Sequence, residues 1–520
     1  MRERQLKSVS RLVRIVNILI MTALLSFTLN AEEQTGSLTI RDSVDFYKNP
    51  VKELRGDLKS IIDNPDFANA LIGVSVISLE KGEYFFKHNE NKNFIPASTQ
   101  KLLTTFSAIS ILGGDFKYST KLFLDGELKD NGEFIGNLII RGSGDPTLSK
   151  YYHKDPVKIM ESWINKLDSM GIRSIQGNII GDDRYFDNVF YGPGWAWDDM
   201  LYPFSSQVNS LSFNDNKIDV YIFQGDSVGE TTNIEVYPPN SYIRIINNIK
   251  TGKPEALTNI IPVRETGTNL IELSGVISYD STDKRNYEKI QITIDNPTLF
   301  FLNVFREVLE SRQIRFRGAL LDVDDLNTKV NYRNLRSFIE YESPELSEII
   351  KIINRVSHNL GAEMLLKTVA KENTGIGSFE TGTQVIEEFL SKNGVNTNNI
   401  VIVDGSGLSR MNLFTPNYLI TILSSIYRSQ YKNVMLNSLA RPGKKGTLER
   451  RLTRSLATDK VFAKTGSMNN VSTICGYVVT RDGEDLAFAI MFQNFTVPSS
   501  LAKNLQDLIL MRLTSFTRER

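Results

Sequence analysis

A tract of short, β-rich runs from residue 114 to residue 335 interrupts this chain of 520 residues. Gly, Asn and Asp break the tract at short intervals, whereas apolar residues recur at helical spacing in the segments on either side. The segment after the tract ends in strand patterns and an amphipathic helix. The order of helix, strands, helical middle, strands and final helix predicts one α/β (α+β) domain that is split by a long, mostly β insertion.

Local patterns place the elements of the split domain. Before the insertion, we expect a helix at 51–63 and a hairpin at 70–88. After it, we expect helices at 346–353, 362–370 and 500–513, and strands at 461–464, 474–479 and 486–492. The predicted domains are residues 32–113 together with 336–520 for the split domain, and residues 114–335, as two small domains, for the insertion.

Composition and charge exclude several classes of protein. Sixty Lys and Arg residues balance sixty Asp and Glu residues, so no basic footprint argues for nucleic acid. The three histidines are scattered and no His-Glu-x-x-His motif occurs, which argues against a zinc site. The single cysteine, Cys475, lies in a strand-like run and is predicted to be a small buried residue. The sequence therefore implies no metal and no organic cofactor.

The first 31 residues follow the order of a secretory signal peptide. Five basic residues precede an apolar run at 15–29, and Ala31 stands just before two glutamates. The apolar run is short for a membrane span. We expect residues 1–31 to be removed and the protein to be periplasmic or secreted, with an uncleaved membrane anchor as the alternative.

Ser98 and Lys101 stand three residues apart where a polar loop meets a predicted helix. Pro96 precedes them and an apolar run follows, so both side chains are expected on one face of the first turn. A serine hydroxyl becomes a good nucleophile when a base takes its proton, and a lysine can be that base if its pKa is lowered. The same spacing recurs at residues 78–81, 281–284 and 500–503, so the pair alone does not identify a site.

Two further motifs complete a catalytic pattern. Ser357-His358-Asn359 precedes a predicted helix, and Lys464-Thr465-Gly466-Ser467 ends a predicted strand. Ser-x-x-Lys, a Ser-x-Asn element and Lys-Thr-Gly together form the signature of serine β-lactamases and penicillin-binding proteins. In this pattern Ser98 attacks an amide carbonyl, Lys101 accepts its proton, and Ser357 relays a proton to the leaving amine.

The same pattern assigns binding roles. Asn359 is expected to donate to the substrate amide and to help hold Lys101. Lys464 supplies positive charge for the substrate carboxylate, and Thr465 donates to that carboxylate. The backbone amides of Ser98 and Met468 are expected to hold the oxyanion. A second Lys-Thr-Gly, at 250–252, is followed by Lys-Pro and is predicted to be a surface turn.

With these motifs, the chain resembles a class C low-molecular-mass penicillin-binding protein, of the D-alanyl-D-alanine carboxypeptidase/endopeptidase family. Further blocks typical of that family lie at 142–148, 194–200 and 404–410, and the long gap between Ser98 and Ser357 accommodates the family's inserted domains. The resemblance implies hydrolysis of the D-alanyl-D-alanine bond of peptidoglycan stems, or of the D-alanyl–diaminopimelate cross-link, through an acyl-enzyme that penicillin also forms. It implies that substrate contacts the strand at Thr465, Gly466, Ser467 and Met468, and that its diaminopimelate side chain enters a pocket formed by Asp199, Arg410, Phe204 and Asn469.

Two other functions stay open. A β-lactamase or esterase on the same fold would need efficient deacylation, and no dedicated glutamate for that step is identified. A non-catalytic cell-wall binding protein would not require the Ser98–Lys101 pair. The expected partners are peptidoglycan stem peptides and β-lactams, with no nucleic acid. The sequence does not separate carboxypeptidase from endopeptidase activity, and it leaves open a loose membrane association and a homo-oligomer.

Overall fold

The computed structural model describes residues 49–283, 286–327 and 329–519. Glu53–Arg520 belong to one compact unit. The predicted signal segment, residues 1–31, lies outside the described residues. In the part of the chain that is described, no helix is both long enough and apolar enough to cross a membrane.

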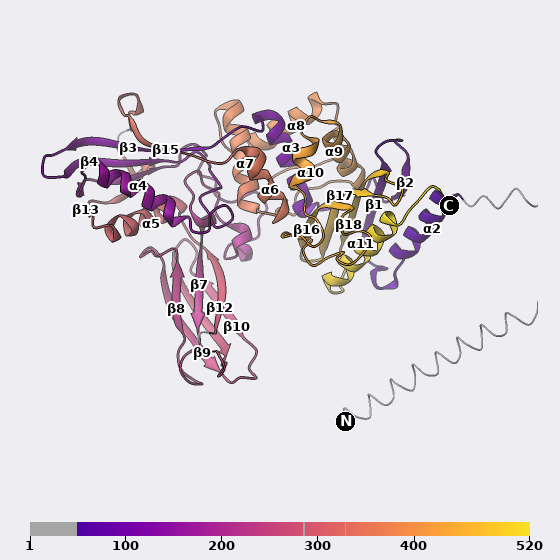
Figure 1. The fold of residues 1–520 in the computed structure, drawn as a ribbon, viewed down its shortest axis with the longest axis horizontal. Coiled ribbons are helices and arrows are strands. Elements are labelled where there is room, and N and C mark those ends of the chain that lie inside the picture. The colour runs from indigo at the N-terminus through magenta and orange to yellow at the C-terminus, as the bar shows by residue number, and fades with distance from the viewer. Residues whose placement is uncertain (1–48, 284–285, 328, 520) are drawn as a thin grey trace, which may run out of the picture. The chain divides into compact units, whose positions relative to one another are not determined.

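A five-stranded antiparallel sheet joins the two ends of this unit (Figure 1). Its strand order is β16-β17-β18-β1-β2. The strands are β1 (Leu71–Ser78), β2 (Tyr84–His88), β16 (Val461–Met468), β17 (Val471–Val479) and β18 (Asp485–Gln493). β1 pairs with β18 over its whole length, from Leu71 opposite Gln493 to Ser78 opposite Leu486. A hairpin from the start of the chain is thus completed by strands from its end.

Helices cover this sheet and share an apolar core with it. β17 and β18 are buried at almost every position, because α11 (Ser499–Thr514) contacts β17 and α9 (Pro416–Arg428) contacts β18 and β1. The remaining helices of this part are α2 (Pro50–Ile62), α3 (Lys101–Leu112), α6 (Leu346–Arg355), α7 (Asn359–Thr374), α8 (Phe379–Lys392) and α10 (Lys432–Ser438). Buried apolar side chains of α3, α6, α7, α8 and α9 share one core with β17 and β18. The predicted mixed fold, an antiparallel sheet flanked by helices, is confirmed.

The intervening segment is mostly β, as expected. One seven-stranded sheet contains β3 (Ser119–Leu128), β4 (Glu133–Arg141), β5 (Ser174–Gln176), β6 (Ile179–Asp182), β13 (Arg315–Arg317), β14 (Leu320–Asp322) and β15 (Ser337–Glu342). Two three-stranded sheets contain β7 (Lys217–Phe223), β8 (Asn233–Tyr237) and β12 (Tyr287–Thr293), and β9 (Arg244–Gly252), β10 (Asn259–Arg264) and β11 (Leu270–Ser278). Helices α4 (Val157–Ser169) and α5 (Pro297–Ser311) share an apolar core with these strands. The exact domain limits, 113/114 and 335/336, stay a prediction.

Two local predictions differ from the structure. Ser98 lies in a 3-10 turn, Ala97–Gln100, and the α-helix begins at Lys101, so the predicted nucleophile precedes the α-helix. Residues 250–252 are not a surface turn, because they end β9, which pairs in parallel with β11, and Thr251 is buried. Pro254, which argued against a strand here, lies just beyond the end of β9.

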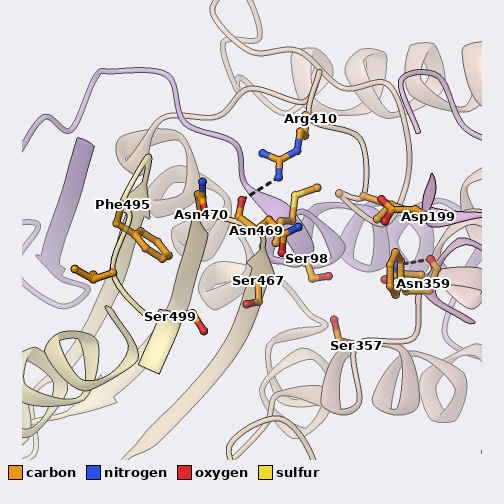
Figure 2. Close-up of a pocket in the computed structure, with 15 residues that line it drawn as sticks. Ser98, Asp199, Ser357, Asn359, Arg410, Ser467, Asn469, Asn470, Phe495 and Ser499 are labelled. Carbon is orange, nitrogen blue, oxygen red and sulfur yellow. Dashed lines mark hydrogen bonds between the residues drawn. The ribbon is translucent and has the colours of Figure 1, made fainter. Parts of the chain in front are cut away.

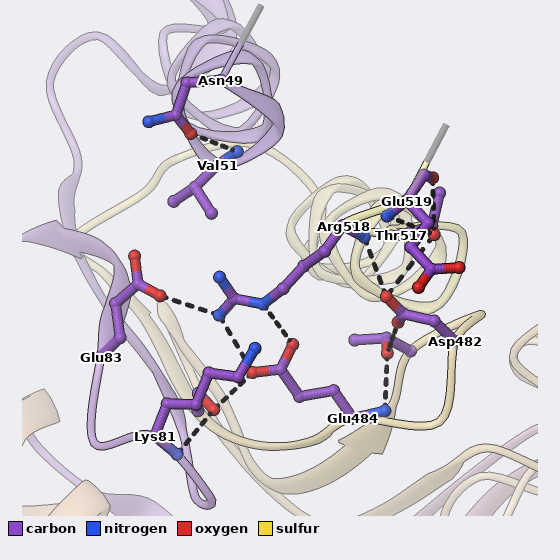
Figure 3. Close-up of polar contacts among 11 residues, drawn as sticks. Asn49, Val51, Lys81, Glu83, Asp482, Glu484, Thr517, Arg518 and Glu519 are labelled. Atoms are coloured by element: carbon purple, nitrogen blue, oxygen red, sulfur yellow. Dashed lines mark hydrogen bonds and ion pairs between the residues drawn. The ribbon is translucent and has the colours of Figure 1, made fainter.

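The last described residues are bonded to two turns of the five-stranded sheet (Figure 3). The guanidinium of Arg518 donates to Glu484, at 2.8 and 3.0 Å, and to Glu83, at 2.8 Å. Glu83 lies in the β1–β2 turn, and Glu484 lies just before β18, where it also accepts from Ser78 Oγ at 2.5 Å. One arginine therefore connects the last described residues to two hairpins of the sheet, β1–β2 and β17–β18.

Candidate active site

A pocket with a volume of about 660 Å³ opens above Ser98 (Figure 2). The motifs predicted from the sequence converge on it: Ser98 from the 3-10 turn, Ser357 and Asn359 from the start of α7, and Ser467 and Met468 from the end of β16. The residues predicted for the side-chain pocket also line it, and these are Asp199, Phe204, Arg410 and Asn469. Lys101 and Lys464 lie beneath this surface with no exposed area, and Gly466 is buried beside Ser98.

Lys101 lies against the nucleophile and meets only neutral oxygen atoms. Its Nζ donates to Ser98 Oγ at 2.9 Å, to Asn359 Oδ1 at 2.6 Å and to the carbonyl of Ser406 at 2.7 Å. Burial lowers the pKa of Lys101 to about 7, although the carboxylates of Glu363 and Asp404 act in the opposite direction. A lysine with such a pKa can lose its proton near neutral pH and then accept the proton of Ser98.

Lys464 holds the second hydroxyl of the site. Its Nζ donates to Ser357 Oγ at 2.9 Å and to the carbonyl of Thr465 at 2.8 Å. Burial lowers the pKa of Lys464 well below its usual value, and the charge of Lys101 acts in the same direction. Ser357 has a φ of 62°, in the left-handed region that costs a non-glycine residue free energy. This backbone conformation lets α6 end and α7 begin with Ser357 Oγ directed toward Lys464.

Two glycines allow neighbouring segments to approach the turn that carries Ser98. A Cβ atom at Gly407, whose φ is 79°, would lie 2.0 Å from the carbonyl oxygen of Ala97. A Cβ atom at Gly466 would lie 2.9 Å from the amide nitrogen of Ser98. The Lys-Thr-Gly motif therefore needs its glycine because β16 passes directly beside the nucleophile. The use of the Ser98 and Met468 amides as an oxyanion hole stays a prediction.

Glu363 is a buried carboxylate of this site that the sequence analysis missed. It accepts from the backbone amides of Gly405, at 2.6 Å, and Ser406, at 2.8 Å, and the carbonyl of Ser406 is one of the acceptors of Lys101. Burial, together with the nearby Asp404, raises the pKa of Glu363. Glu363 follows Asn359 by four residues, so helical spacing from the Ser-x-Asn motif could have indicated it.

Asp404 fastens the block at 404–410 to the inserted segment. Its Oδ2 accepts from the indole nitrogen of Trp195 at 3.0 Å and from the amide of Ser409 at 2.7 Å. Its Oδ1 accepts from the amide of Gly407 at 2.8 Å and from Asn412 Nδ2 at 2.9 Å. The two family-like blocks at 194–200 and 404–410 are thus bonded to each other beside the nucleophile.

Both charged residues predicted for the side-chain pocket lie in the wall of this pocket. Arg410 donates to the carbonyl of Asn469 at 2.9 Å. Burial and the neighbouring Asp198 raise the pKa of Asp199, and the charge of Arg410 opposes this rise. The side-chain amide of Asn359 donates to the carbonyl of Phe204 at 2.7 Å, so in this structure it binds the wall and not open solvent.

The sequence analysis also missed one segment of the lining. Phe495, Val497 and Ser499, between β18 and the start of α11, line the same pocket and add an apolar edge to it (Figure 2). Nothing local in that connection distinguishes it from an ordinary turn. In the described part of the chain, no group of three or more His, Cys, Asp or Glu side chains could hold a metal ion. Cys475 is buried, as predicted.

Comparison with known proteins agrees with this geometry. A model of the D-Ala-D-Ala carboxypeptidase 3 (S13) family matches residues 54–515. A D-alanyl-D-alanine carboxypeptidase from Actinomadura sp. (strain R39) is 30% identical over 475 residues, which cover 89% of this chain and 85% of the relative. D-alanyl-D-alanine carboxypeptidase DacB from Haemophilus influenzae is 26% identical over 431 residues, with 82% and 86% of the two chains covered.

The crystal structure of penicillin binding protein 4 (dacB) from Haemophilus influenzae has the same fold. It matches with a TM-score of 0.75 at 22% identity, over 90% of this chain and 99% of that one. The relatives and this fold confirm the resemblance that the motifs indicated. The chain belongs to the D-Ala-D-Ala carboxypeptidase 3 (S13) family.

Proposed function

We propose that this protein is a serine D-alanyl-D-alanine carboxypeptidase/endopeptidase, which cleaves peptidoglycan stem peptides or cross-links through an acyl-enzyme on Ser98. The observation that carries the proposal is the contact between a buried lysine of lowered pKa and a serine hydroxyl, 2.9 Å apart, at the base of the pocket. This pair has the reach and the protonation needed for nucleophilic catalysis without a histidine.

Acylation uses both lysine–serine pairs. Neutral Lys101 accepts the proton of Ser98 as Oγ attacks the carbonyl carbon of the penultimate D-Ala, and the C–O bond formed leaves a tetrahedral oxyanion. The intermediate then breaks its C–N bond, and Ser357 Oγ gives a proton to the departing amine. Ser357 regains a proton from the ammonium group of Lys101, which becomes neutral again, and Lys464, 2.9 Å from Ser357, keeps its own proton and holds that hydroxyl in place. Water next attacks the ester with Lys101 as base, and the released Ser98 recovers its hydroxyl.

Lys464 also has the position to recognise the terminal carboxylate of the substrate. Burial disfavours its ammonium form, because it lowers the pKa of Lys464. A carboxylate brought next to it would favour that ammonium form, because opposite charges stabilise each other strongly at low dielectric constant. Binding and protonation of Lys464 are then coupled, which favours substrates with a free carboxylate beside the scissile bond.

Asp199 and Arg410 are proposed to bind the amine and the carboxylate of a diaminopimelate side chain. For a stem peptide whose diaminopimelate side chain carries both an amine and a carboxylate, Asp199→Asn should raise KM about fivefold. The reason is that one charge-assisted hydrogen bond is weakened. The acylation rate with benzylpenicillin should stay unchanged in this variant. Equal loss with both compounds would show that Asp199 supports the site in general and does not select the side chain.

The proposed ligands are peptidoglycan stem peptides and β-lactams, and the proposed location is the periplasm, after removal of residues 1–31. A loose membrane association and a homo-oligomer stay predictions.

Intact-protein mass spectrometry after addition of benzylpenicillin tests the proposal, with Ser98→Ala as the control. Wild-type protein should gain the mass of one drug molecule, and the variant should gain none and lose at least about 10⁴-fold in hydrolysis of a D-alanyl-D-alanine peptide. Rapid drug hydrolysis without a trapped adduct would favour a β-lactamase. Neither adduct nor hydrolysis from folded protein would favour a binding protein.

A further inference from the structure

A second cavity, of about 350 Å³, adjoins the segment that leads to Ser357. It lies where the end of α6 meets the inserted segment, near the start of β7 and the end of β12. The basic side chains in its lining come from five places in the sequence, and these are Lys150, Lys217, Lys289, Arg355 and Lys445. None of these residues belongs to the catalytic motifs.

Positive charge exceeds negative charge around this cavity. Asp215, in the lining, lies 3.2 Å from Lys217, and Asp219 pairs with Lys150 at 2.6 Å and with Lys289 at 3.1 Å. Two carboxylates therefore serve three lysines. Neither Arg355 nor Lys445 forms an ion pair with any carboxylate of residues 49–283, 286–327 and 329–519. This concentration of charge contrasts with a whole chain whose formal net charge is zero.

The lining of the cavity also includes a residue with a buried, unpaired hydrogen-bond acceptor. Asn214 lines the cavity and is only 1% exposed, and its Oδ1 has no hydrogen-bond partner in the described structure. Its Nδ2 donates to the carbonyl of Lys217 at 2.8 Å, which fixes the amide in place. A buried acceptor without a partner destabilises the protein, and a hydrogen bond from a ligand donor would remove that cost. The lining thus contains cationic side chains that could bind an oxyanion. It also contains one acceptor, Asn214 Oδ1, for a hydrogen-bond donor of the same ligand.

We propose that this cavity binds a small oxyanion, a carboxylate- or phosphate-bearing molecule that also carries a hydrogen-bond donor. Arg355 and Lys445 hold the anionic group, because guanidinium and ammonium groups form charge-assisted hydrogen bonds with such oxygens. The donor of the ligand meets Asn214 Oδ1. The volume suits a ligand at the small end of the usual range.

The position of the cavity connects its occupant to the catalytic motif. Arg355 is two residues before Ser357. His358 Nε2 lies 3.0 Å from Asp215 Oδ1, so the middle residue of the Ser-x-Asn motif contacts the lining. An oxyanion bound here would lie next to the residues that position Ser357 without entering the catalytic pocket.

Isothermal titration calorimetry on the full chain tests the proposal with two probes, inorganic phosphate and the acidic dipeptide L-Ala-γ-D-Glu. The test variant is Arg355→Gln/Lys445→Gln. The matched control is Lys392→Gln/Arg428→Gln, which removes the same charge from exposed positions on α8 and α9. We expect saturable binding of at least one probe, about tenfold weaker in the test variant and unchanged in the control. The probe that binds more tightly identifies the source of the oxyanion.

Two results would overturn the proposal. One is the absence of saturable binding of either probe to the wild-type chain at low salt. The other is an equal loss of affinity in the test variant and the control, which would reveal diffuse surface charge. Lys445→Gln alone keeps the test valid if Arg355 is needed for folding, because Lys445 is exposed; it should weaken binding about threefold.

Discussion

The catalytic site and the basic cavity each bury a lysine, and they treat its charge in opposite ways. Lys101 donates to a hydroxyl, an amide oxygen and a carbonyl, and burial lowers its pKa to about 7. Lys217 is almost as buried, and burial acts on it in the same direction, but Asp215 at 3.2 Å reverses the effect and raises its pKa. The oxygen that faces the amine, more than burial itself, decides whether a lysine can serve as a base.

The same difference applies to stability. A buried ammonium that meets only neutral acceptors is costly at neutral pH, whereas one that meets a carboxylate recovers much of its lost hydration. The catalytic site therefore opposes folding at the position where it needs a base, and the cavity does not.

Lys101→Arg should have the largest effect on activity, because it replaces a lysine that can lose its proton with a side chain that stays charged. Arginine keeps the positive charge and cannot lose its proton in a protein, so it cannot accept the proton of Ser98. The acylation rate with benzylpenicillin, followed by stopped flow, should fall about 10³-fold. Lys392→Arg, on an exposed helix face, serves as the control. If Lys101→Arg were acylated within about tenfold of the wild-type rate, Lys101 would not be the base.

Two methionine variants should change the free energy of unfolding in opposite directions. Lys217→Met should destabilise the protein by about 3 kcal/mol, since Asp215 would stay buried with His358 as its remaining partner. Lys101→Met should stabilise the protein, because it removes a buried cation that no carboxylate contacts directly. Urea denaturation at pH 7 measures both, and the double variant Asp215→Asn/Lys217→Met should recover part of the loss. If both single variants changed the free energy of unfolding in the same direction, the proposed difference between Lys101 and Lys217 would be wrong.

Glu363→Gln tests whether Glu363 positions Lys101 through the loop that contains Gly405 and Ser406. Glutamine keeps one acceptor for the amides of Gly405 and Ser406 and places an NH₂ group against the other, so the Ser406 carbonyl should move. We expect kcat to fall about 30-fold with KM little changed, and the pH dependence of acylation to shift. Glu380→Gln, exposed at the start of α8, should have no effect. An unchanged pH dependence would reduce Glu363 to a purely structural role.

The mildest effect should come from pH alone. Lys101 must be neutral to accept a proton, so its lowered pKa predicts that acylation falls about tenfold for each pH unit below about 7. Lys217, whose pKa is raised, stays charged between pH 5 and about 9. Binding of the carboxylate probe in the cavity should therefore stay constant from pH 6 to about 7, where the probe's carboxylates stay ionised and its α-amino group stays protonated. A flat acylation profile would mean that another group takes the proton.

Much of the split domain could be predicted because its signals are local. Apolar spacing predicted a helix at 346–353, where α6 spans Leu346–Arg355, and strands that match β16, β17 and β18. The three motifs indicated which residues meet at the pocket, because each carries its chemistry in a few adjacent positions. Residues 250–252 were misread for the same reason: Lys253 and Pro254 suggested a turn, while pairing with β11 keeps them in a strand.

The rest of the site depends on contacts between distant segments. Asn359 bonds to the carbonyl of Phe204, 155 positions away, and no periodicity predicts a backbone carbonyl at that place. Glu363 was missed because its role arises from the loop it holds. The apolar edge at Phe495 exists because β18 and β16 end at the same edge of the sheet, with the start of β17 between them. Tertiary arrangement assigns these roles.

The pairing of β1 with β18 determines when the protein can become active. Ser78 and Glu484, bonded across this sheet, are 406 positions apart, so a growing chain carries the nucleophile long before the strands that complete its sheet are made. The inserted segment has its own sheets and core, and it can fold in the interval. We therefore expect that a chain ending before Gln493 contains Ser98, Lys101 and Ser357 but has no reactive serine, because part of β18 is missing. No catalytic activity is expected until the synthesis of the chain has passed β18.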